Sequence, residues 1–227
     1  MSAVVVTGAS RGIGRATALA LATRGFDVAL LARTTAELGS VAELAMQRGI
    51  TALPIHCDVT SLEEVRSAAA RVLGELGAPA AVINNAGTIR RAAIQDMSLD
   101  DFRFVLDTNL TGTFLMTRAF LPAMLERKAG RFIQVASISS TLGTAGAAAY
   151  CAAKWGVVGF TKSLAEELRG TGLSAMSVLP GSVDTAMLEG SGFAPKMSPE
   201  EVARAIVYAA VDAPGAMNGS SLEIFGP

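Results

Sequence analysis

Three side chains near the middle of the chain have the types and spacing for acid–base chemistry: Ser137, Tyr150 and Lys154. Tyr150 and Lys154 are four residues apart in an Ala-rich stretch that predicts a helix, and this spacing places both side chains on one face. A free phenol has a pKa of about 10, and a neighbouring ammonium lowers that value. Ser137 follows a short apolar run, so it would lie at the carboxyl end of a strand, where active sites of open α/β sheets form. The three residues predict proton transfer to or from an alcohol or carbonyl oxygen. Taken alone, a Tyr–Lys pair at this spacing is also common on exposed helices, so the rest of the chain must decide.

A glycine-rich turn follows the first apolar run, at residues 7–14 with the sequence TGASRGIG. Glycine permits a tight turn and a close approach of the backbone to a pyrophosphate, and the N-terminus of the next helix offers free N–H groups. The spacing G-x-x-x-G-x-G differs from the G-x-G-x-x-G fingerprint, and a tight connection without a ligand is the alternative. Its place between a strand and a helix favours nucleotide binding.

The residues after the second apolar run indicate which nucleotide binds. An NAD site typically has Asp or Glu there, which binds the ribose 2′-hydroxyl. This chain has Ala32, Arg33 and Thr34 instead. Arg11 and Arg33 could flank a 2′-phosphate, because guanidinium groups bind phosphate in a bidentate manner. We therefore expect NADP(H) as the cofactor, with NAD(H) as the alternative if Arg33 is a solvated residue that leads into a helix.

The composition predicts one compact domain spanning residues 1–227. About half of the chain is apolar (51%), and 19 basic residues balance 20 acidic ones. Such a balance gives no net field for nucleic acid or an anionic membrane surface. Two cysteines, Cys57 and Cys151, and the single His56 match no recognised metal-ligand spacing, so we expect no metal site and two small core cysteines. No apolar run reaches membrane-spanning length and no secretion signal is evident, so we expect a cytoplasmic protein.

Short apolar runs alternate with Ala-rich stretches along the whole chain. The predicted strands are residues 3–6, 28–31, 51–56, 80–83, 132–135, 175–179 and 222–225. The predicted helices are residues 13–24, 35–48, 62–74, 99–127, 148–170 and 199–211. Several strands are apolar without alternation, as in a parallel sheet that is covered on both faces. The pattern predicts an α/β fold, a single doubly wound Rossmann-type parallel sheet of about seven strands with helices on both faces.

Six motifs in order give the chain a resemblance to the short-chain dehydrogenase/reductase family, over nearly its whole length. They are the glycine turn, the sequence NNAG at residues 84–87, Asn109, Ser137, the Tyr150–Lys154 pair, and PGSVDT at residues 180–185. Within the family the chain is most similar to members like 3-oxoacyl-(acyl-carrier-protein) reductase. This resemblance says little about the substrate.

The resemblance implies a role for each motif. Tyr150 would be the acid/base, Lys154 would lower its pKa and hold the nicotinamide ribose, Ser137 would position the substrate oxygen, and Asn109 would anchor a water for proton relay. Asp58 would meet the adenine, and Asn84 would line the adenosine side. The full set implied for the cofactor is Gly8, Ser10, Arg11, Gly12, Ile13, Gly14, Arg33, Thr34, Asp58, Val59, Asn85, Ala86, Gly87, Tyr150, Lys154, Pro180, Gly181, Val183 and Thr185. The alternatives are that Asn109 and Asp58 are helix caps and that residues 84–87 form only a turn.

The predicted helix over residues 148–170 is apolar or small on almost every side, so it must be buried on more than its sheet-facing side. Together with the helix before it, it would pack against a second subunit, as in the family; we expect a homodimer or homotetramer. Pro122 should kink or locally break the preceding helix. Arg127, Lys128 and Arg169 could face an acidic carrier protein.

The substrate is the least defined part of the prediction. Residues 180–199 form a Gly/Ser/Pro-rich interval typical of a substrate lid, and an apolar pocket would be lined by Leu142, Met187, Leu188 and Phe193. Arg90 and Arg91 could attract an anionic group, although a solvated pair is the more ordinary interpretation. We expect a carbonyl–alcohol oxidoreductase; the alternatives are an NAD-dependent alcohol or sugar dehydrogenase and a nucleotide-binding sensor or scaffold without turnover.

Overall fold

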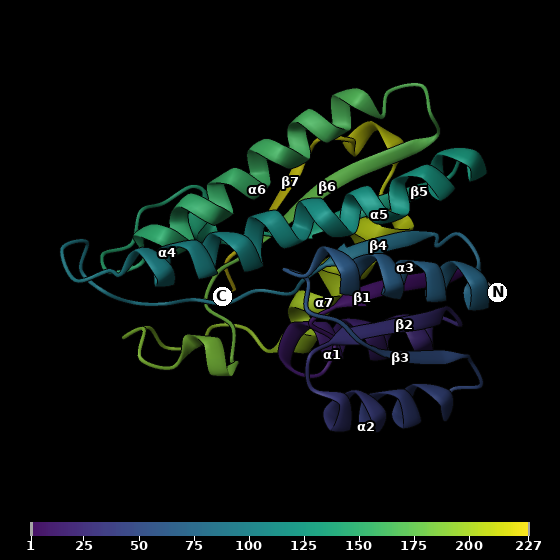
Figure 1. Ribbon diagram of the computed structural model, residues 1–227, viewed down its shortest axis with the longest axis horizontal. Coiled ribbons are helices and arrows are strands. Elements are labelled where there is room, and N and C mark those ends of the chain that lie inside the picture. The colour runs from purple at the N-terminus through teal and green to yellow at the C-terminus, as the bar shows by residue number, and fades with distance from the viewer. Residues whose placement is uncertain (1, 227) are drawn as a thin grey trace.

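The computed structural model describes residues 2–226 and contains one seven-stranded parallel sheet with the order β3-β2-β1-β4-β5-β6-β7 (Figure 1). Its strands are β1 (Ala3–Thr7), β2 (Asp27–Ala32), β3 (Ala52–His56), β4 (Ala81–Asn84), β5 (Gly130–Val135), β6 (Leu173–Pro180) and β7 (Ser221–Ile224). The predicted doubly wound α/β fold is confirmed, and each predicted strand lies within two residues of the observed one.

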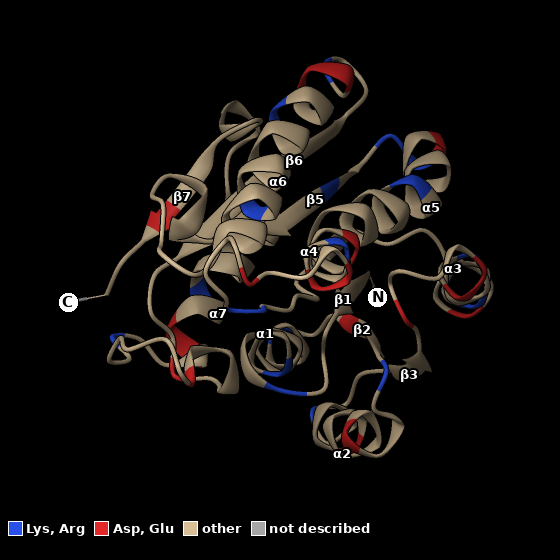
Figure 2. Ribbon diagram, turned by 60° about the vertical axis from the view of Figure 1, so that its left-hand side comes forward, with Lys and Arg blue, Asp and Glu red and all other residues tan. Residues whose placement is uncertain are grey.

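Helices cover both faces of the sheet, which explains why the strands are apolar without alternation (Figure 2). One face packs against α1 (Gly12–Thr23), α2 (Thr35–Met46) and α7 (Pro199–Val207). The other packs against α3 (Leu62–Leu76), α5 (Gly112–Arg127) and α6 (Ala148–Glu167). In β1, Val4 and Val6 belong to the first layer and Val5 to the second, and all three side chains are fully buried.

The long helix predicted over residues 99–127 is not regular. It consists of α4 (Leu99–Leu106), a π-helical turn η1 (Asp107–Thr111) and α5. The side-chain amide of Asn109 donates to the carbonyl oxygen of Val105 at 2.8 Å, which is the acceptor that residue 109's own N–H would use in a regular α-helix. Pro122, by contrast, does not break α5, which continues to Arg127.

Asn109 and Asp58, for which helix capping was the alternative interpretation, do not cap a helix. Asn109 lies within the π turn and caps no helix. Helix α3 is capped by Ser61, whose hydroxyl accepts from the N–H of Glu64 at 3.3 Å, while the carboxylate of Asp58 accepts from the N–H of Thr60 at 2.9 Å. The Asp58 side chain therefore does not cap α3, and Asp58 belongs to the loop at the end of β3.

Strand β1 pairs with β2 on one side and with β4 on the other, so the strand order reverses at β1. The loops at the carboxyl ends of these strands diverge at that point, which is where open α/β sheets bind their ligands. None of the helices in residues 2–226 is long and apolar enough to cross a membrane.

Candidate active site

A cleft of about 1470 Å³ opens at the carboxyl edge of the sheet. The glycine turn after β1, the loops after β2, β3, β4 and β5, the start of α6 and the 180–199 segment all contribute to its walls. Every residue that the sequence suggested for catalysis or cofactor binding lines this cleft except Gly14, Asn84 and Asn109. One surface therefore brings together residues from across the chain.

Tyr150 and Lys154 lie in the first turns of α6 and face the end of β5. The ammonium of Lys154 lies 5.6 Å from the centre of the Tyr150 ring and donates to the carbonyl oxygen of Val135 at 2.8 Å. The Ser140 hydroxyl donates to the carbonyl oxygen of Lys154 at 2.9 Å, which ties α6 to the turn after β5. Ser137, Tyr150 and Lys154 are all at most 9% exposed. These three side chains are thus largely shielded from water.

The electrostatics of the pair differ from the sequence prediction. Burial raises the pKa of Tyr150, and a hydrogen bond with the Ser137 side chain opposes that rise. Burial also lowers the pKa of Lys154 to about 8, because the charged ammonium loses hydration. In the protein alone, burial is thus the largest effect on the pKa of Tyr150, and the lowering by Lys154 stays a prediction. At neutral pH, Tyr150 is a protonated phenol and is suited to donate a proton.

Asn109 lies beneath the cleft rather than in its wall. It is fully buried, and its side-chain amide also donates to the carbonyl oxygen of Thr88 at 2.8 Å. A Cβ atom added to Gly87 would lie 2.8 Å from the Asn109 Oδ1 and 3.7 Å from the Lys154 Nζ. Gly87 therefore leaves room for the side chains of Asn109 and Lys154, a reason for this glycine that sequence reasoning did not give.

The glycine turn leaves the start of α1 open to the cleft. Gly8 and Gly12 adopt positive φ angles of 64° and 54°, and no side chain caps the first N–H groups of α1. These amides are unpaired donors at the positive end of the helix, so they can bind a pyrophosphate. Gly14 has a different role from the one implied: a Cβ there would lie 2.2 Å from the carbonyl oxygen of Gly8, so this glycine allows α1 to pack against the turn.

Asn84 does not line the adenosine side of the cleft. Its side chain points into the core, where its amide donates to the Oε1 of Gln134 at 2.8 Å and to the Oγ1 of Thr117 at 3.2 Å. Asn85 does line the cleft, and its side-chain amide donates to the carbonyl oxygen of Thr7 at 2.9 Å. Asn84 thus forms hydrogen bonds inside the core, and Asn85 binds the glycine turn.

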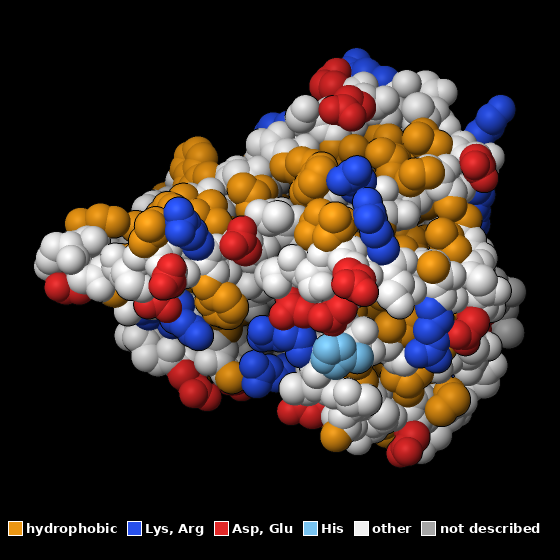
Figure 3. Space-filling view, viewed as in Figure 1, with side chains coloured by type: hydrophobic (Ala, Val, Ile, Leu, Met, Phe, Trp, Pro, Cys, Tyr) orange, Lys and Arg blue, Asp and Glu red, His pale blue; other side chains and the backbone are white. Residues whose placement is uncertain are grey.

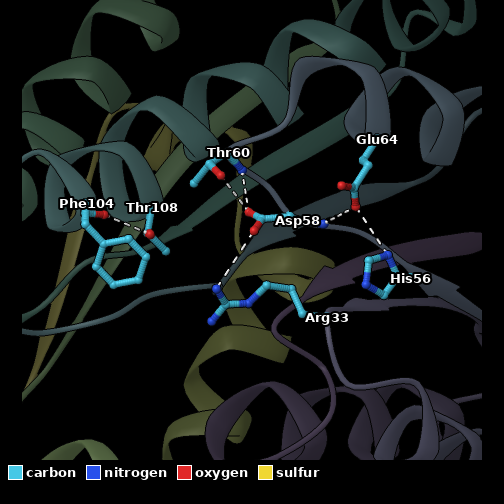
Figure 4. Close-up of polar contacts among 7 residues, drawn as sticks. All are labelled: Arg33, His56, Asp58, Thr60, Glu64, Phe104 and Thr108. Carbon is cyan, nitrogen blue, oxygen red and sulfur yellow. Dashed lines mark hydrogen bonds and ion pairs between the residues drawn. The ribbon is translucent and has the colours of Figure 1, made fainter. Parts of the chain in front are cut away.

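Away from Tyr150, Arg33 and Asp58 line the cleft and begin a row of polar contacts that continues to Glu64 and His56 (Figure 4). The guanidinium of Arg33 lies 3.8 Å from the carboxylate of Asp58, and Glu64 accepts from the N–H of Asp58 at 2.9 Å. The Glu64 carboxylate also lies 3.2 Å from the Nδ1 of His56. Backbone and side-chain hydrogen bonds from Thr60, followed by the charge of Arg33, hold the pKa of Asp58 below its usual value despite partial burial. Asp58 thus holds Arg33 over the wall of the cleft.

The lid segment carries one contact that the sequence did not predict. A bridge between Val183 and Met197 closes its base, and η3 (Ala186–Leu188) lies between these two residues. The guanidinium of Arg91 donates to the carbonyl oxygens of Met187 at 3.1 Å and Glu189 at 3.3 Å. The expected apolar residues Leu142, Met187, Leu188 and Phe193 line the same end of the cleft. The adjacent arginines were the only sequence signal for this contact. The Arg91 side chain bonds to carbonyls that are 96 and 98 residues away, and such a contact leaves no local sequence pattern.

Comparisons with known proteins agree with this arrangement. A family model described as short chain dehydrogenase matches residues 2–193. A 3-oxoacyl-(acyl-carrier-protein) reductase from Synechocystis is 37% identical over 98% of this chain and 94% of its own length. One from Vibrio harveyi is 36% identical over 98% of this chain and 95% of its own. The crystal structure of a short-chain type dehydrogenase/reductase from Mycobacterium marinum superposes with a TM-score of 0.94 at 35% identity, and covers 99% of this chain and 94% of that one.

Proposed function

The chain belongs to the short-chain dehydrogenase family, and we propose that it interconverts a carbonyl compound and a secondary alcohol with NADP(H), with Tyr150 as the acid/base. Membership makes it an oxidoreductase of CH–OH and carbonyl groups. The observation that supports the residue assignment best is the buried group of Ser137, Tyr150 and Lys154 at the carboxyl edge of β5. When bound, the nicotinamide supplies or accepts the hydride at the carbonyl carbon.

The residues of this chain would handle the proton and the orientation of the substrate. In the reductive direction the Tyr150 phenol donates a proton to the substrate oxygen, and the Ser137 hydroxyl donates a hydrogen bond to the same oxygen. Lys154 would return a proton to the phenol, and the buried Asn109, whose side chain also lies beside Gly87, would anchor the water that connects Lys154 to solvent. Because its pKa is raised, the phenol is protonated at neutral pH and carries the proton that the reductive direction needs.

Two features support a nicotinamide dinucleotide in the cleft, and one supports the phosphorylated form. The unpaired N–H groups at the start of α1 suit a pyrophosphate, and the cleft has room for a dinucleotide beside a substrate. Arg11 and Arg33 both line the wall where the adenine ribose would lie, and β2 ends in Ala32 without a carboxylate. Asp58 pairs with Arg33 and would release it to a 2′-phosphate, which carries more charge.

We expect the protein to bind NADPH at least about 10-fold more tightly than NADH, and Arg33→Ala to lose most of that preference. A charge-assisted hydrogen bond contributes about 1.5–3 kcal/mol, which corresponds to roughly 10- to 100-fold in affinity. Titration with each cofactor, followed by nicotinamide fluorescence and by thermal shift, measures both numbers. Arg71→Ala is the matched control, because Arg71 is exposed on α3 and pairs with Glu75. Tighter binding of NADH by the unmodified protein would contradict the proposal.

The substrate is proposed to be a small or medium-sized carbonyl compound. The curated relatives reported above are 3-oxoacyl-(acyl-carrier-protein) reductases, so 3-oxoacyl thioesters and 3-oxo esters are the first compounds to assay. Leu142, Met187 and Phe193 are 59%, 37% and 59% exposed at the mouth of the cleft. These side chains would pack against the apolar part of such a substrate.

We also propose that α5 and α6 form an interface between copies of this chain. Hydrophobic side chains gather over these two helices (Figure 3), and Phe114, Leu125 and Trp155 remain 38–54% exposed there. We expect light scattering to give a dimer or tetramer at micromolar concentration, and the Trp155 emission, from the only tryptophan, to shift to the red as the assembly dissociates on dilution. A monomer mass at these concentrations would contradict the interface.

A further inference from the structure

Arg91 is placed differently from its neighbour Arg90, although both lie in the loop after β4. Arg90 turns away to α4, where it lies 3.4 Å from the carboxylate of Asp101 and 5.0 Å from the centre of the Phe104 ring. Arg91 instead reaches the lid and donates to the carbonyl oxygens of Met187 and Glu189. Both arginines are exposed, as the sequence favoured, but they make different contacts.

The charge of Arg91 is not neutralised by the protein. No carboxylate within residues 2–226 lies within 4 Å of its guanidinium, including that of Glu189, whose backbone it contacts. Both of its partners are neutral carbonyl oxygens. Arg91 also lies close enough to the reacting phenol for its charge to oppose the rise in the pKa of Tyr150. An unneutralised cation thus stands in the cleft on the substrate side of Tyr150.

The geometry of the guanidinium leaves a binding edge free. It has five N–H donors in a planar fork, and the two lid carbonyls use two of them. The remaining N–H groups can donate to a carboxylate, whose planar oxygens match the fork. The lid contacts fix the fork in place, so little side-chain freedom would be lost when an anion binds.

We propose that Arg91 is the specificity-determining residue of the substrate site and binds a carboxylate carried by the carbonyl substrate, so that keto acids are preferred to their neutral analogues. The inference rests on the proposed function and narrows its substrate class. The substrate carbonyl would lie at Ser137 and Tyr150, and the carboxylate at Arg91, beside its contact with η3 of the lid. Because the same guanidinium holds the lid, a bound carboxylate would also join the loop after β4 to the closed lid.

The test compares each of three keto acids, acetoacetate, 4-oxopentanoate and 5-oxohexanoate, with its ethyl ester. For at least one pair, the unmodified protein should show a higher kcat/KM for the acid, and Arg91→Gln should lower the ratio of acid to ester by about 10- to 100-fold. The kcat/KM for the ester itself should change by less than about threefold. Arg91→Lys keeps the charge but not the fork, and should retain part of the preference. Arg90→Gln is the matched control and should leave the ratio unchanged, because Arg90 also lines the cleft but its charge is paired with Asp101.

The other outcomes separate the possible failures. If acid and ester lose activity together in Arg91→Gln, Arg91 acts only as a lid contact and the inference is overturned. The inference is also overturned if the acid-to-ester ratio of kcat/KM is the same in Arg91→Gln as in the unmodified protein. If esters and acids alike give no NADPH-dependent reduction with the unmodified protein, the proposed function fails first, and the substrate class falls with it. Thermal melting of each variant shows whether a loss comes from unfolding.

Discussion

Tyr150→Phe should lower kcat/KM for carbonyl reduction by about 10²- to 10⁴-fold and leave NADPH affinity within about threefold of the unmodified protein. This range is the usual contribution of a positioned general acid. Phe keeps the ring, which is 9% exposed and packs with Val105 and Ala149, but it removes the proton that the buried phenol carries at neutral pH. Steady-state kinetics with a ketone that the protein reduces, together with a fluorescence titration with NADPH, measures both quantities.

Tyr208→Phe provides the matched control, because it removes a hydroxyl from the only other tyrosine of the chain. Tyr208 is 41% exposed, and its hydroxyl contacts the sulfur of Met217 at 3.7 Å. We expect its kinetics to stay within about twofold of the unmodified protein. Near-normal activity in Tyr150→Phe would show that another group supplies the proton and would remove the acid/base assignment.

Lys154→Met should reduce kcat/KM by at least about 10²-fold and at the same time stabilise the fold at pH 7 by roughly 1–2 kcal/mol. The Lys154 side chain is 4% exposed, and burial lowers its pKa from 10.5 to about 8. The charge therefore destabilises the folded state by about 3 kcal/mol. Met fills a similar volume without a charge, but leaves the carbonyl oxygen of Val135 without its partner, at a cost of about 1 kcal/mol.

The same substitution should behave differently at high pH. Below the folded pKa of about 8 the lysine is charged in both states, so the full cost of burial applies. Between pH 8 and 10.5 the unfolded chain binds more protons than the folded one, so the stability of the unmodified protein rises relative to Lys154→Met. Urea unfolding of both proteins at pH 7 and pH 10 tests this sign. Lys162→Met, at an exposed lysine of the same helix, should change stability by less than about 0.5 kcal/mol. A Lys154→Met protein that is less stable at pH 7 would contradict the burial argument.

The sheet could be predicted because each strand is a short apolar run between turn signals, as in β1 and β2. The order of motifs along the chain then placed the glycine turn, Ser137 and Tyr150 at one edge, since parallel strands share their carboxyl ends. The π turn at Asn109 could not be predicted in this way. Its sequence reads as ordinary helix, and only the side-chain contacts of Asn109 with Val105 and Thr88 distinguish it.

Other differences arise from long-range contacts that no local pattern records. Asn84 turns inward because Gln134 lies opposite it in the neighbouring strand, and Gly14 is needed because α1 approaches the carbonyl of Gly8. The direction of the Tyr150 pKa depends on how deeply α6 is buried, which sequence spacing does not determine. Spacing therefore predicted which residues meet, and packing determined their charge states and partners.

Transfer of deuterium from NADPH labelled with two deuterium atoms at nicotinamide C4 is the most direct test of the central claim. The assay uses a ketone that the unmodified protein reduces, such as a 3-oxo ester, and mass spectrometry of the alcohol. We expect the alcohol to carry one deuterium on its carbinol carbon, and Tyr150→Phe to form it at least about 100-fold more slowly. An alcohol without deuterium, or a labelled alcohol formed equally fast by Tyr150→Phe, would contradict the account.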